Sequence, residues 1–332
     1  MEFMKYFNEL GKEDFELAGG KAANLGELTK AGFKVPPGFC VTSNTLFHII
    51  DHNNLNAKIS DIVARFNYDD FADIEAKSGQ IRELIFSAKV PQEIIEEYKQ
   101  ALSQLLDGGD DFVAVRSSVA VKDTAISSFP GMMDTYHYLR GEDEILEHIR
   151  KCCASLWTDR AVFTRHHKGI DHRLGLISPI VQKMVFSEIA GILFTANPIS
   201  KSRDEMVIES NWGLGESVVS GKSMNDFFCL DKQTLEVKDK KISQKTTIYT
   251  FDKEKGSGRK MCEVDPEKGK ASTLSDEQLR ELGVGGKKIE DHFGYPQDIE
   301  WAYQDGNLYF LQSRNIRTLD QEGGKTNGPK DR

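Results

Sequence analysis

The sequence predicts an α+β protein, and three observations lead to that prediction. Helical periodicity dominates residues 22–106, apolar runs typical of strands dominate the part after residue 176, and no internal repeat of about 20 to 50 residues is found. The length of 332 residues corresponds to about two domains of ~150 residues. Two α+β units are therefore expected, and solenoids, propellers and disulfide-stapled miniproteins are excluded.

The first part of the chain predicts helices followed by one buried strand. Apolar residues recur at helical spacing in residues 22–30, 46–50, 55–66, 70–88 and 91–106. The apolar run at residues 112–115 predicts a strand that ends at Arg116, Ser117 and Ser118 and delivers polar side chains to a loop. A further long helix is predicted over residues 142–167.

The second part is richer in strands. Strands are predicted at residues 177–185, 190–196, 206–209 and 226–230, a helix at 275–293 and a hairpin at 298–314. Residues 252–270 are rich in Gly, Lys and Glu and predict an exposed loop or ribbon. We expect one subdomain over residues 1–188, a second over 189–318, and a flexible tail or linker over 319–332.

Charge and cysteine usage restrict the class of partner and the compartment. The 43 basic and 52 acidic residues give a net charge of −9, which disfavours nucleic acid or an anionic membrane as the main partner. The five cysteines have no CxxC spacing, which argues against disulfides and a zinc site. No basic-then-apolar signal or long apolar run is found, so a cytoplasmic location is expected. The eight histidines are interpreted as structural.

The predicted C-terminal hairpin can be paired residue by residue. A three-residue turn at Asp305, Gly306 and Asn307 sets Gln304 opposite Leu308. Continuing that register sets Glu300 opposite Gln312 and Asp298 opposite Arg314 on one side of the ribbon. The other side is then the apolar one and comprises Ile299, Trp301, Tyr303, Tyr309 and Leu311.

The polar side of this hairpin combines two carboxylates, an amide and a guanidinium. Carboxylate and amide oxygens suit a hard divalent cation, and arginine suits a phosphate chain. A solvent-facing ribbon with a cross-strand salt bridge explains the same residues equally well. The pattern by itself leaves both interpretations open.

Two further segments carry cations that could hold a phosphate. Gly19, Gly20 and Lys21 come just before a predicted helix, whose N-terminal amides favour anions, although the segment is not a Walker A loop. Arg116 follows a buried strand directly, where its guanidinium can be held rigidly. The alternatives are a glycine cap with a surface lysine and an arginine at a strand end.

Three more segments could approach a nucleotide. Residues 127–135 form a loop with small hydroxyl residues and glycine that could fold over phosphates, or it could be an ordinary loop with a hydrophobic plug. Residues 181–185 could line a flat base, although interior packing explains them too. Residues 191–198 and 209–216 add a strand, glycine turns and two acids, Glu209 and Glu216, that could face the same ligand.

Taken together and in order, these segments resemble one known family. The motifs are GGKAANLGEL, VPPGFCVT, FVAVRSS, SFPGMMDT, IVQKMV, GILFTANP, ESNWGLGESVVSG, DIEW and FLQSRN. They resemble the ATP-grasp nucleotide-binding domain of the phosphoenolpyruvate synthase and pyruvate phosphate dikinase family over about residues 14–318. The chain departs from the synthase pattern at Val121, Lys122 and Asp123, where an acidic pair is usual. The resemblance implies a two-lobed ATP-grasp fold with the nucleotide in the cleft between the lobes.

The resemblance also implies roles for particular residues. By that resemblance Lys21 and Arg116 hold the phosphates, Arg314 contacts the γ-phosphate, and Glu300 and Gln312 bind Mg²⁺. The implied lid over the phosphates comprises Ser127, Ser128, Gly131, Met132, Met133, Asp134 and Thr135, and the implied adenine and nucleotide contacts comprise Gln182, Lys183, Met184, Val185, Thr195 and Glu216.

The implied activity is that of an ATP-dependent phosphotransferase that is incomplete as an isolated chain. In the family, a pyrophosphoryl or phosphoryl group passes from ATP to a histidine on a mobile domain and then to an acceptor such as pyruvate or a phenol-like hydroxyl. No TSH-type phosphohistidine segment and no acceptor domain are found here. We therefore expect a phosphohistidine carrier and an acceptor-binding domain or subunit as partners. The alternative is a non-catalytic ATP sensor that binds a partner.

Overall fold

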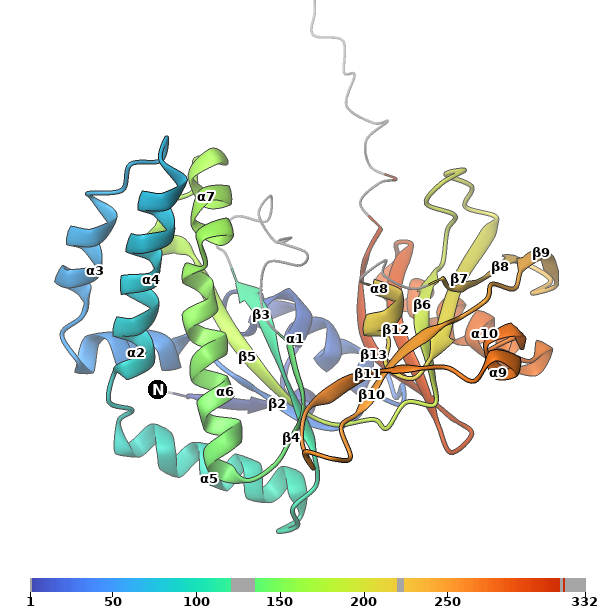
Figure 1. Cartoon of the computed structure of the whole chain (residues 1–332), viewed down its shortest axis with the longest axis horizontal. Coiled ribbons are helices and arrows are strands. Elements are labelled where there is room, and N and C mark those ends of the chain that lie inside the picture. Colours follow the sequence, from blue (N-terminus) through green and yellow to red (C-terminus); the bar gives the residue numbers. More distant parts are fainter. Residues whose placement is uncertain (1, 121–134, 220–223, 317–318, 320–332) are drawn as a thin grey trace, which may run out of the picture. The chain divides into compact units, whose positions relative to one another are not determined.

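The computed structural model of the chain describes residues 2–120, 135–219, 224–316 and 319. Contacts within the chain define two compact units. Unit 1 comprises Met1–Met184 and Phe251–Arg259, and unit 2 comprises Val185–Thr250 and Lys260–Arg332. Both units combine helices with a β-sheet, which confirms the predicted α+β class (Figure 1). The predicted lid, except for Thr135, and the predicted tail, except for residue 319, lie outside the described residues.

Unit 1 contains an antiparallel sheet with the strand order β1-β2-β5-β3-β4. Its strands are β1 (Met4–Tyr6), β2 (Gly38–Val41), β3 (Val113–Ala120), β4 (Thr135–Leu139) and β5 (Leu176–Lys183). Its helices are α1 (Phe15–Lys30), α2 (Ser43–His52), α3 (Asn56–Val63), α4 (Phe71–Ser87), α5 (Gln92–Leu106), α6 (Glu142–Ala154) and α7 (Asp159–His167).

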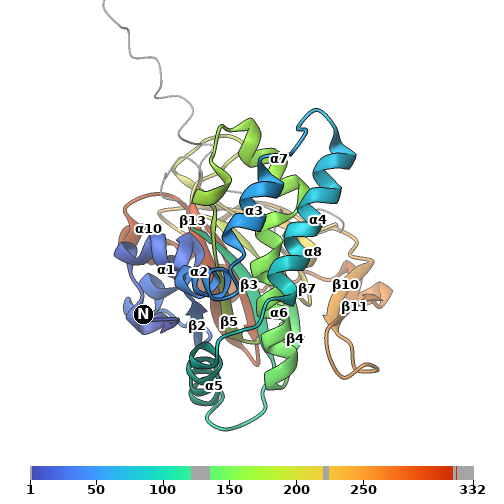
Figure 2. The same ribbon diagram turned by 90° about the vertical axis from the view of Figure 1, so that its left-hand side faces the viewer.

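The sheet of unit 1 is buried on both faces. One face, with Val113, Val115 and Val181, packs against the apolar sides of α2, α5 and α6. Helix α4 packs against α6, and α3 packs against α4 (Figure 2). The other face, with Cys40 and Ile180, packs against α1. Because side chains alternate along a strand, this second face also receives Arg116 and Ser118 of β3.

Two predictions for unit 1 are wrong in detail. The helix predicted over residues 142–167 is broken into α6 and α7, because Thr158 is extended and its hydroxyl caps α7 by accepting from the amide of Ala161. The strand predicted to end at residue 115 continues through Ala120 in β3. Pairing with β5, including Ser118 opposite Ser178, keeps these polar residues in the sheet.

Unit 2 contains an antiparallel sheet with the strand order β13-β12-β6-β7-β8-β9. These strands are β6 (Ile189–Phe194), β7 (Glu205–Trp212), β8 (Asp226–Asp231), β9 (Val237–Lys241), β12 (Gln297–Gln304) and β13 (Asn307–Asn315). Strands β10 (Thr247–Phe251) and β11 (Arg259–Glu263) form a separate two-stranded sheet. The helices are α8 (Glu216–Val219), α9 (Pro266–Lys270) and α10 (Asp276–Phe293). The segment over residues 252–270, predicted as an exposed loop or ribbon, contains β11 and α9.

The two faces of the unit 2 sheet differ in burial. Leu193, Ile208 and Trp301 lie on a fully buried face, against which α10 packs. The Ser275 and Gln278 capping box begins α10, and Gly294 ends it in the left-handed conformation. The opposite face, which we call the open face, carries partly exposed residues such as Ile192, Glu209 and Glu300.

None of the helices in the described ranges is both long enough and apolar enough to cross a membrane.

Candidate functional site

The glycine-lysine segment of unit 1 lies at a break in α1. Gly19 has a φ of 74° and a ψ of 164°, which interrupts the helix one residue before Gly20. A Cβ at Gly19 would lie 2.4 Å from Oγ of Ser118 and 2.7 Å from the carbonyl oxygen of Val119. Only glycine fits this backbone at this distance from β3. Lys21 is thereby placed at the start of a new helical segment, directly against the end of β3.

Ser118 takes part in this arrangement as a helix cap from another element. Its hydroxyl oxygen accepts a hydrogen bond of 3.2 Å from the amide of Ala22. That amide belongs to the group of N-terminal helix donors that lack an intrahelical partner. Ser118 was expected to deliver its side chain to a loop, whereas in β3 this side chain holds α1 on the sheet.

Arg116 lies on the same face of the sheet as Ser118, the face that packs against α1. Its Nη1 is 3.5 Å from Oε1 of Gln182, which is buried on the neighbouring strand. Nε2 of Gln182 donates to the carbonyl oxygen of Pro36 at 3.1 Å, which fixes the amide group. The structure therefore brings the predicted residues Lys21, Arg116 and Gln182 to one side of unit 1.

The rest of the predicted adenine segment follows at the end of β5. Nζ of Lys183 forms an ion pair of 3.0 Å with Asp111, and the amide of Met184 donates to the carbonyl oxygen of Phe112. Val185 belongs to unit 2, where it packs with Ala190 and Ala302. Nothing in these contacts tests a role in binding adenine, which stays a prediction. Thr135, the first residue of β4, is paired with Arg116.

In unit 2 two predicted cross-strand pairs of the hairpin are confirmed. Glu300 is opposite Gln312, and Asp298 is opposite Arg314. The turn is shorter than predicted, because Gln304 pairs with Asn307 and only Asp305 and Gly306 lie between the strands. Both turn residues have positive φ, 51° and 71°, as a two-residue Asp-Gly turn of type I′ requires.

A register shift between Glu300 and Trp301 compensates for the shorter turn. One extra residue on β13 restores the predicted pairing at Gln312 and Arg314. The shift also changes which side chains face the core. Leu308 and Phe310 are buried opposite Tyr303 and Trp301, whereas the predicted core residues Tyr309 and Leu311 pack with Ala302.

The pairings place the predicted metal ligands in one row across the open face. Gln312, Glu300, Ile192 and Glu209 are successive partners on β13, β12, β6 and β7. Glu209 was noticed as an acid but not assigned to the metal site, and strand alternation alone could not show that it shares this row. Asn225 Nδ2 lies 3.4 Å from Oε2 of Glu209 and orients its carboxylate.

Arg314 is anchored beside this row by Asp298. Nε and Nη2 of Arg314 are both 2.8 Å from Oδ2 of Asp298. Burial raises the pKa of the Asp298 carboxyl, although the charge of Arg314 acts in the opposite direction. The Arg314 side chain stays 46% exposed while Asp298 is almost buried. The guanidinium is thus held at one edge and remains accessible to an anion.

The donor set of the predicted metal site fits Mg²⁺. Glu300 offers a carboxylate and Gln312 an amide oxygen on adjacent strands, and Mg²⁺ commonly uses one or two protein oxygens together with water and substrate phosphates. In the described part of the chain, no group of three or more His, Cys, Asp or Glu side chains is arranged to hold a metal ion. A site formed by protein ligands alone is therefore not found there.

Two other predicted nucleotide contacts lie in different surroundings. Thr195 is fully buried, its Oγ1 accepts from the amide of Gln297 at 2.8 Å, and its methyl group faces α10. This placement gives Thr195 a structural part and does not favour the predicted contact. Glu216 is the first residue of α8 and follows Gly213, whose φ is 76°.

Comparison with known proteins identifies the family. The domain family described as pyruvate phosphate dikinase, AMP/ATP-binding domain, matches residues 15–331. The chain belongs to this family. The predicted ATP binding and the predicted ATP-grasp class are properties of this family, and the resemblance in the sequence is confirmed.

Two relatives represent different members of the family. Phosphoenolpyruvate synthase of Pyrococcus furiosus is 40% identical over 361 residues, which cover 96% of this chain and 44% of the relative. Rifampicin phosphotransferase of Bacillus subtilis is 41% identical over 314 residues, which cover 94% of this chain and 36% of the relative. The chain thus spans less than half the length of either protein.

Among solved structures, the ADP complex of purK, an N5-carboxyaminoimidazole ribonucleotide synthetase, matches 75% of this chain and 57% of its own. The identity is 11% and the TM-score 0.27, so this likeness adds nothing to the family assignment.

Proposed function

We propose that this chain is the Mg²⁺-dependent ATP-binding component of a dikinase-type phosphotransferase. It transfers a pyrophosphoryl or phosphoryl group from ATP to a histidine on a partner subunit or on a further part of a longer protein. The acceptor, pyruvate or a phenol-like hydroxyl, is bound there and not by the described residues. A cytoplasmic location is part of this proposal.

Unit 1 supplies cations for the phosphates. Lys21 lies at the start of a helical segment, where main-chain amides and the helix dipole favour anions. Arg116 lies on the adjoining strand next to the fixed amide of Gln182. These two cations lie on regular elements of the fold, which hold them in place more firmly than a flexible surface loop would. Cations held in place in this way stabilise the charge on the transferred group more effectively. Residues 182–185 are proposed to line the adenine.

Unit 2 supplies the metal ligands and a third cation. Glu300 and Gln312 would hold Mg²⁺, which supplies Lewis-acid neutralisation of the phosphate oxygens when it is bound. Arg314, held by Asp298, contacts the terminal phosphate. In the transfer, a phosphorus–oxygen bond of ATP breaks as a phosphorus–nitrogen bond to the imidazole forms, and AMP or ADP leaves with the electron pair.

The observation that supports this proposal most is the register of β12 and β13. It sets a carboxylate opposite an amide and a carboxylate opposite an arginine on the open face. A salt-bridged ribbon without function would explain the Asp298 pair but would not require Glu300 and Gln312 to face each other beside it. Membership of the AMP/ATP-binding domain family supports the proposal that this pair acts on a nucleotide.

Labelled ATP tests the proposal directly. The chain is incubated with β- and γ-labelled ATP, Mg²⁺ and a histidine carrier of the family, and label on the carrier is measured. Transfer is expected for the natural sequence and for the control Glu267→Gln, an exposed acid on α9. Glu300→Gln should lose about a hundredfold or more of the transfer rate.

Two results would contradict the proposal. Equal transfer by Glu300→Gln and the natural chain would remove the metal role, and ATP binding without transfer to any carrier would favour the alternative of a sensor. For a sensor, Glu300→Gln should leave ATP-dependent binding of a partner largely intact, which a pull-down with and without ATP would show.

A further inference from the structure

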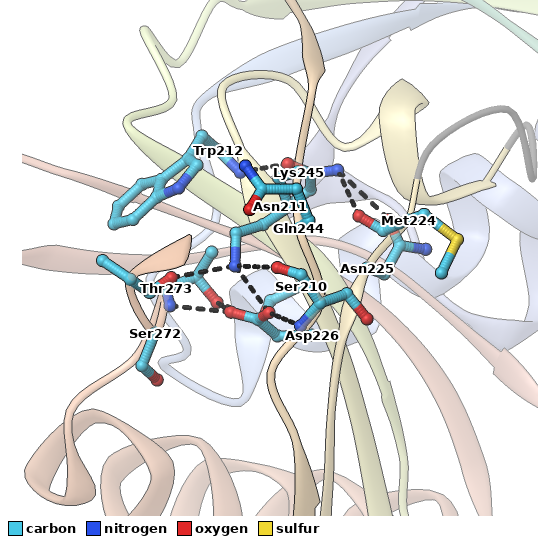
Figure 3. Close-up of polar contacts among 12 residues, drawn as sticks. Ser210, Asn211, Trp212, Met224, Asn225, Asp226, Gln244, Lys245, Ser272 and Thr273 are labelled. Carbon is cyan, nitrogen blue, oxygen red and sulfur yellow. Dashed lines mark hydrogen bonds and ion pairs between the residues drawn. The ribbon is translucent and has the colours of Figure 1, made fainter. Parts of the chain in front are cut away.

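A buried ion pair joins two segments of unit 2 that are distant in the sequence. It lies on the buried side of the sheet. Nζ of Lys245 lies 2.6 Å from Oδ1 of Asp226, and both side chains are fully buried. The ammonium group also donates to the carbonyl oxygens of Ser243, at 3.0 Å, and Ala271, at 2.8 Å. All three donors of the lysine therefore have partners (Figure 3).

Asp226 is equally well satisfied. Its Oδ1 accepts from the amide of Ser243, and its Oδ2 accepts from both the amide and the hydroxyl of Thr273, at 2.8 and 2.9 Å. The Thr273 hydroxyl lies 2.6 Å from that of Ser210 on β7. We call Asp226, Lys245 and Thr273 the clamp. We call the segment of residues 243–273 the excursion. The clamp holds both ends of this segment to strands β7 and β8.

The excursion in turn contacts the glycine loop, which we define as residues 212–217. The amide of Leu214 donates to the carbonyl oxygen of Tyr249, and the amide of Tyr249 lies 3.3 Å from Oγ of Ser217. Nε1 of Trp212 donates to the carbonyl oxygen of Lys268 at 3.1 Å. A Cβ at Gly213 would lie 2.5 Å from the Tyr249 oxygen, so the two backbones touch.

Through these contacts the buried ion pair affects the position of the glycine loop. The glycine loop follows β7, whose Glu209 lies on the open face, and it ends at Glu216 and Ser217 at the start of α8. The position of the glycine loop depends on its contacts with β10 and α9. The positions of β10 and α9 in turn depend on the clamp. A buried pair with every hydrogen bond satisfied is stiff, because any displacement leaves a charge without a partner.

We propose that Asp226 and Lys245 are positioning residues that set the glycine loop for ATP binding, with Thr273 as their third member. This inference rests on the proposed function, because the loop is expected to contact the nucleotide. The clamp residues themselves are buried and do not touch ATP.

The test compares clamp variants with two matched controls. Thr273→Val keeps the shape of the side chain and removes the hydroxyl between Asp226 and Ser210, and Asp226→Asn with Lys245→Met removes both buried charges. Lys270→Met removes an exposed lysine from the same excursion. Ile74→Ala weakens the buried core of unit 1, far along the chain from the clamp. Thermal unfolding identifies a temperature at which every variant is folded.

Two measurements are made at that temperature: amide hydrogen exchange in the glycine loop and the Kd for ATP with Mg²⁺. For the clamp variants we expect faster exchange at Leu214 and its neighbours and a Kd raised by about tenfold or more. Both controls should keep the natural exchange rate and Kd, although Ile74→Ala lowers the unfolding temperature.

The inference is overturned if the folded clamp variants keep natural exchange and affinity, or if Ile74→Ala weakens ATP binding as much as they do. Thr273→Val keeps the test decisive should the double variant not fold. If the natural chain binds no ATP, the proposed function fails. Hydrogen exchange then still decides whether the clamp orders the loop.

Discussion

Two of the ion pairs of unit 2 lie on opposite faces of its sheet and differ in exposure. Asp226 and Lys245 lie on the side of the buried face and leave no donor or acceptor for a ligand. Asp298 and Arg314 lie on the open face, where only one edge of the guanidinium is used. The first pair can only hold protein segments together. In the second pair, Asp298 holds the guanidinium of Arg314 in place while that group stays accessible.

Removing one member of the buried pair should have the largest effect on stability. Lys245→Met leaves the Asp226 carboxylate buried beside an apolar side chain, and we expect a loss of about 3–5 kcal/mol in the free energy of unfolding. Lys270→Met, whose partner Glu267 is exposed, should change it by less than ~1 kcal/mol. Unfolding by denaturant measures the free energy of unfolding of both variants. Equal losses would contradict the expected difference between the buried and the exposed ion pair.

The open pair should show the reverse pattern. Arg314→Met removes a partly exposed guanidinium from a nearly buried carboxyl, so the free energy of unfolding should fall by less than it does for Lys245→Met. Phosphoryl transfer should fall by about a hundredfold or more, because a preorganised donor to the transferred group is lost. Unfolding and label transfer measured on one preparation separate the two effects. A large loss of stability with normal transfer would make this pair structural too.

A second buried cation, in unit 1, extends the comparison. Arg165 is buried on α7, where burial lowers its pKa to about 10, and its Nε donates to Nδ1 of His172 at 3.1 Å. His172 must accept through Nδ1, so its proton resides on Nε2, beside the hydroxyl of Tyr68. Arg165 thus rests against a neutral imidazole where Lys245 rests against a carboxylate.

This arrangement predicts a dependence of stability on pH. Burial first, and then the charge of Arg165, lowers the pKa of His172 to about 4, against about 6.5 in the unfolded chain. The unfolded chain therefore binds the proton first, and stability present above pH 6.5 is lost as the pH falls towards 4. The slope contributed is at most about 1.4 kcal/mol per pH unit.

His172→Gln should reduce that slope, and the exposed His292→Gln should keep it. Unfolding by denaturant at pH 7, 6 and 5 provides the comparison. An unchanged slope in His172→Gln would show that the imidazole is not held neutral by its surroundings.

The smallest expected effect concerns the Asp298 carboxyl. Burial raises its pKa and Arg314 opposes that shift, so Arg314→Met should raise the pKa further. Because the folded pKa lies above the unfolded one, stability is fully present at pH below the unfolded value. It is lost as the pH rises through the folded pKa. An NMR titration of the carboxyl carbon checks the direction, and a fall in pKa would contradict it.

The helices of unit 1 were largely predictable because their apolar positions recur at local spacing. The break between α6 and α7 was not predicted, since the apolar pattern continues across Thr158 while its hydroxyl caps a new helix. The strands β9 to β11 also escaped prediction. Their residues are mostly polar or partly exposed, so the alternation that identifies a strand with one buried face is weak.

The candidate site was predictable where it depends on alternation. Pairing by twos correctly set Glu300 opposite Gln312, although the turn was one residue too long, because the bulge on β13 restored the register. The nucleotide contact at Thr195 was implied by the resemblance alone, and a strand motif does not say which face each residue takes. Its side chain lies against α10.

The order of the sequence motifs indicated the family by resemblance. The sequence by itself determined the α+β class and the polar pairs of the final hairpin, because these follow from local apolar spacing and a period of two. Only the tertiary structure decided which face of the unit 2 sheet α10 covers, and that Asp226, Lys245 and Thr273 meet. Such contacts join residues far apart in the chain, and their choice depends on the burial and hydrogen bonding of the whole unit.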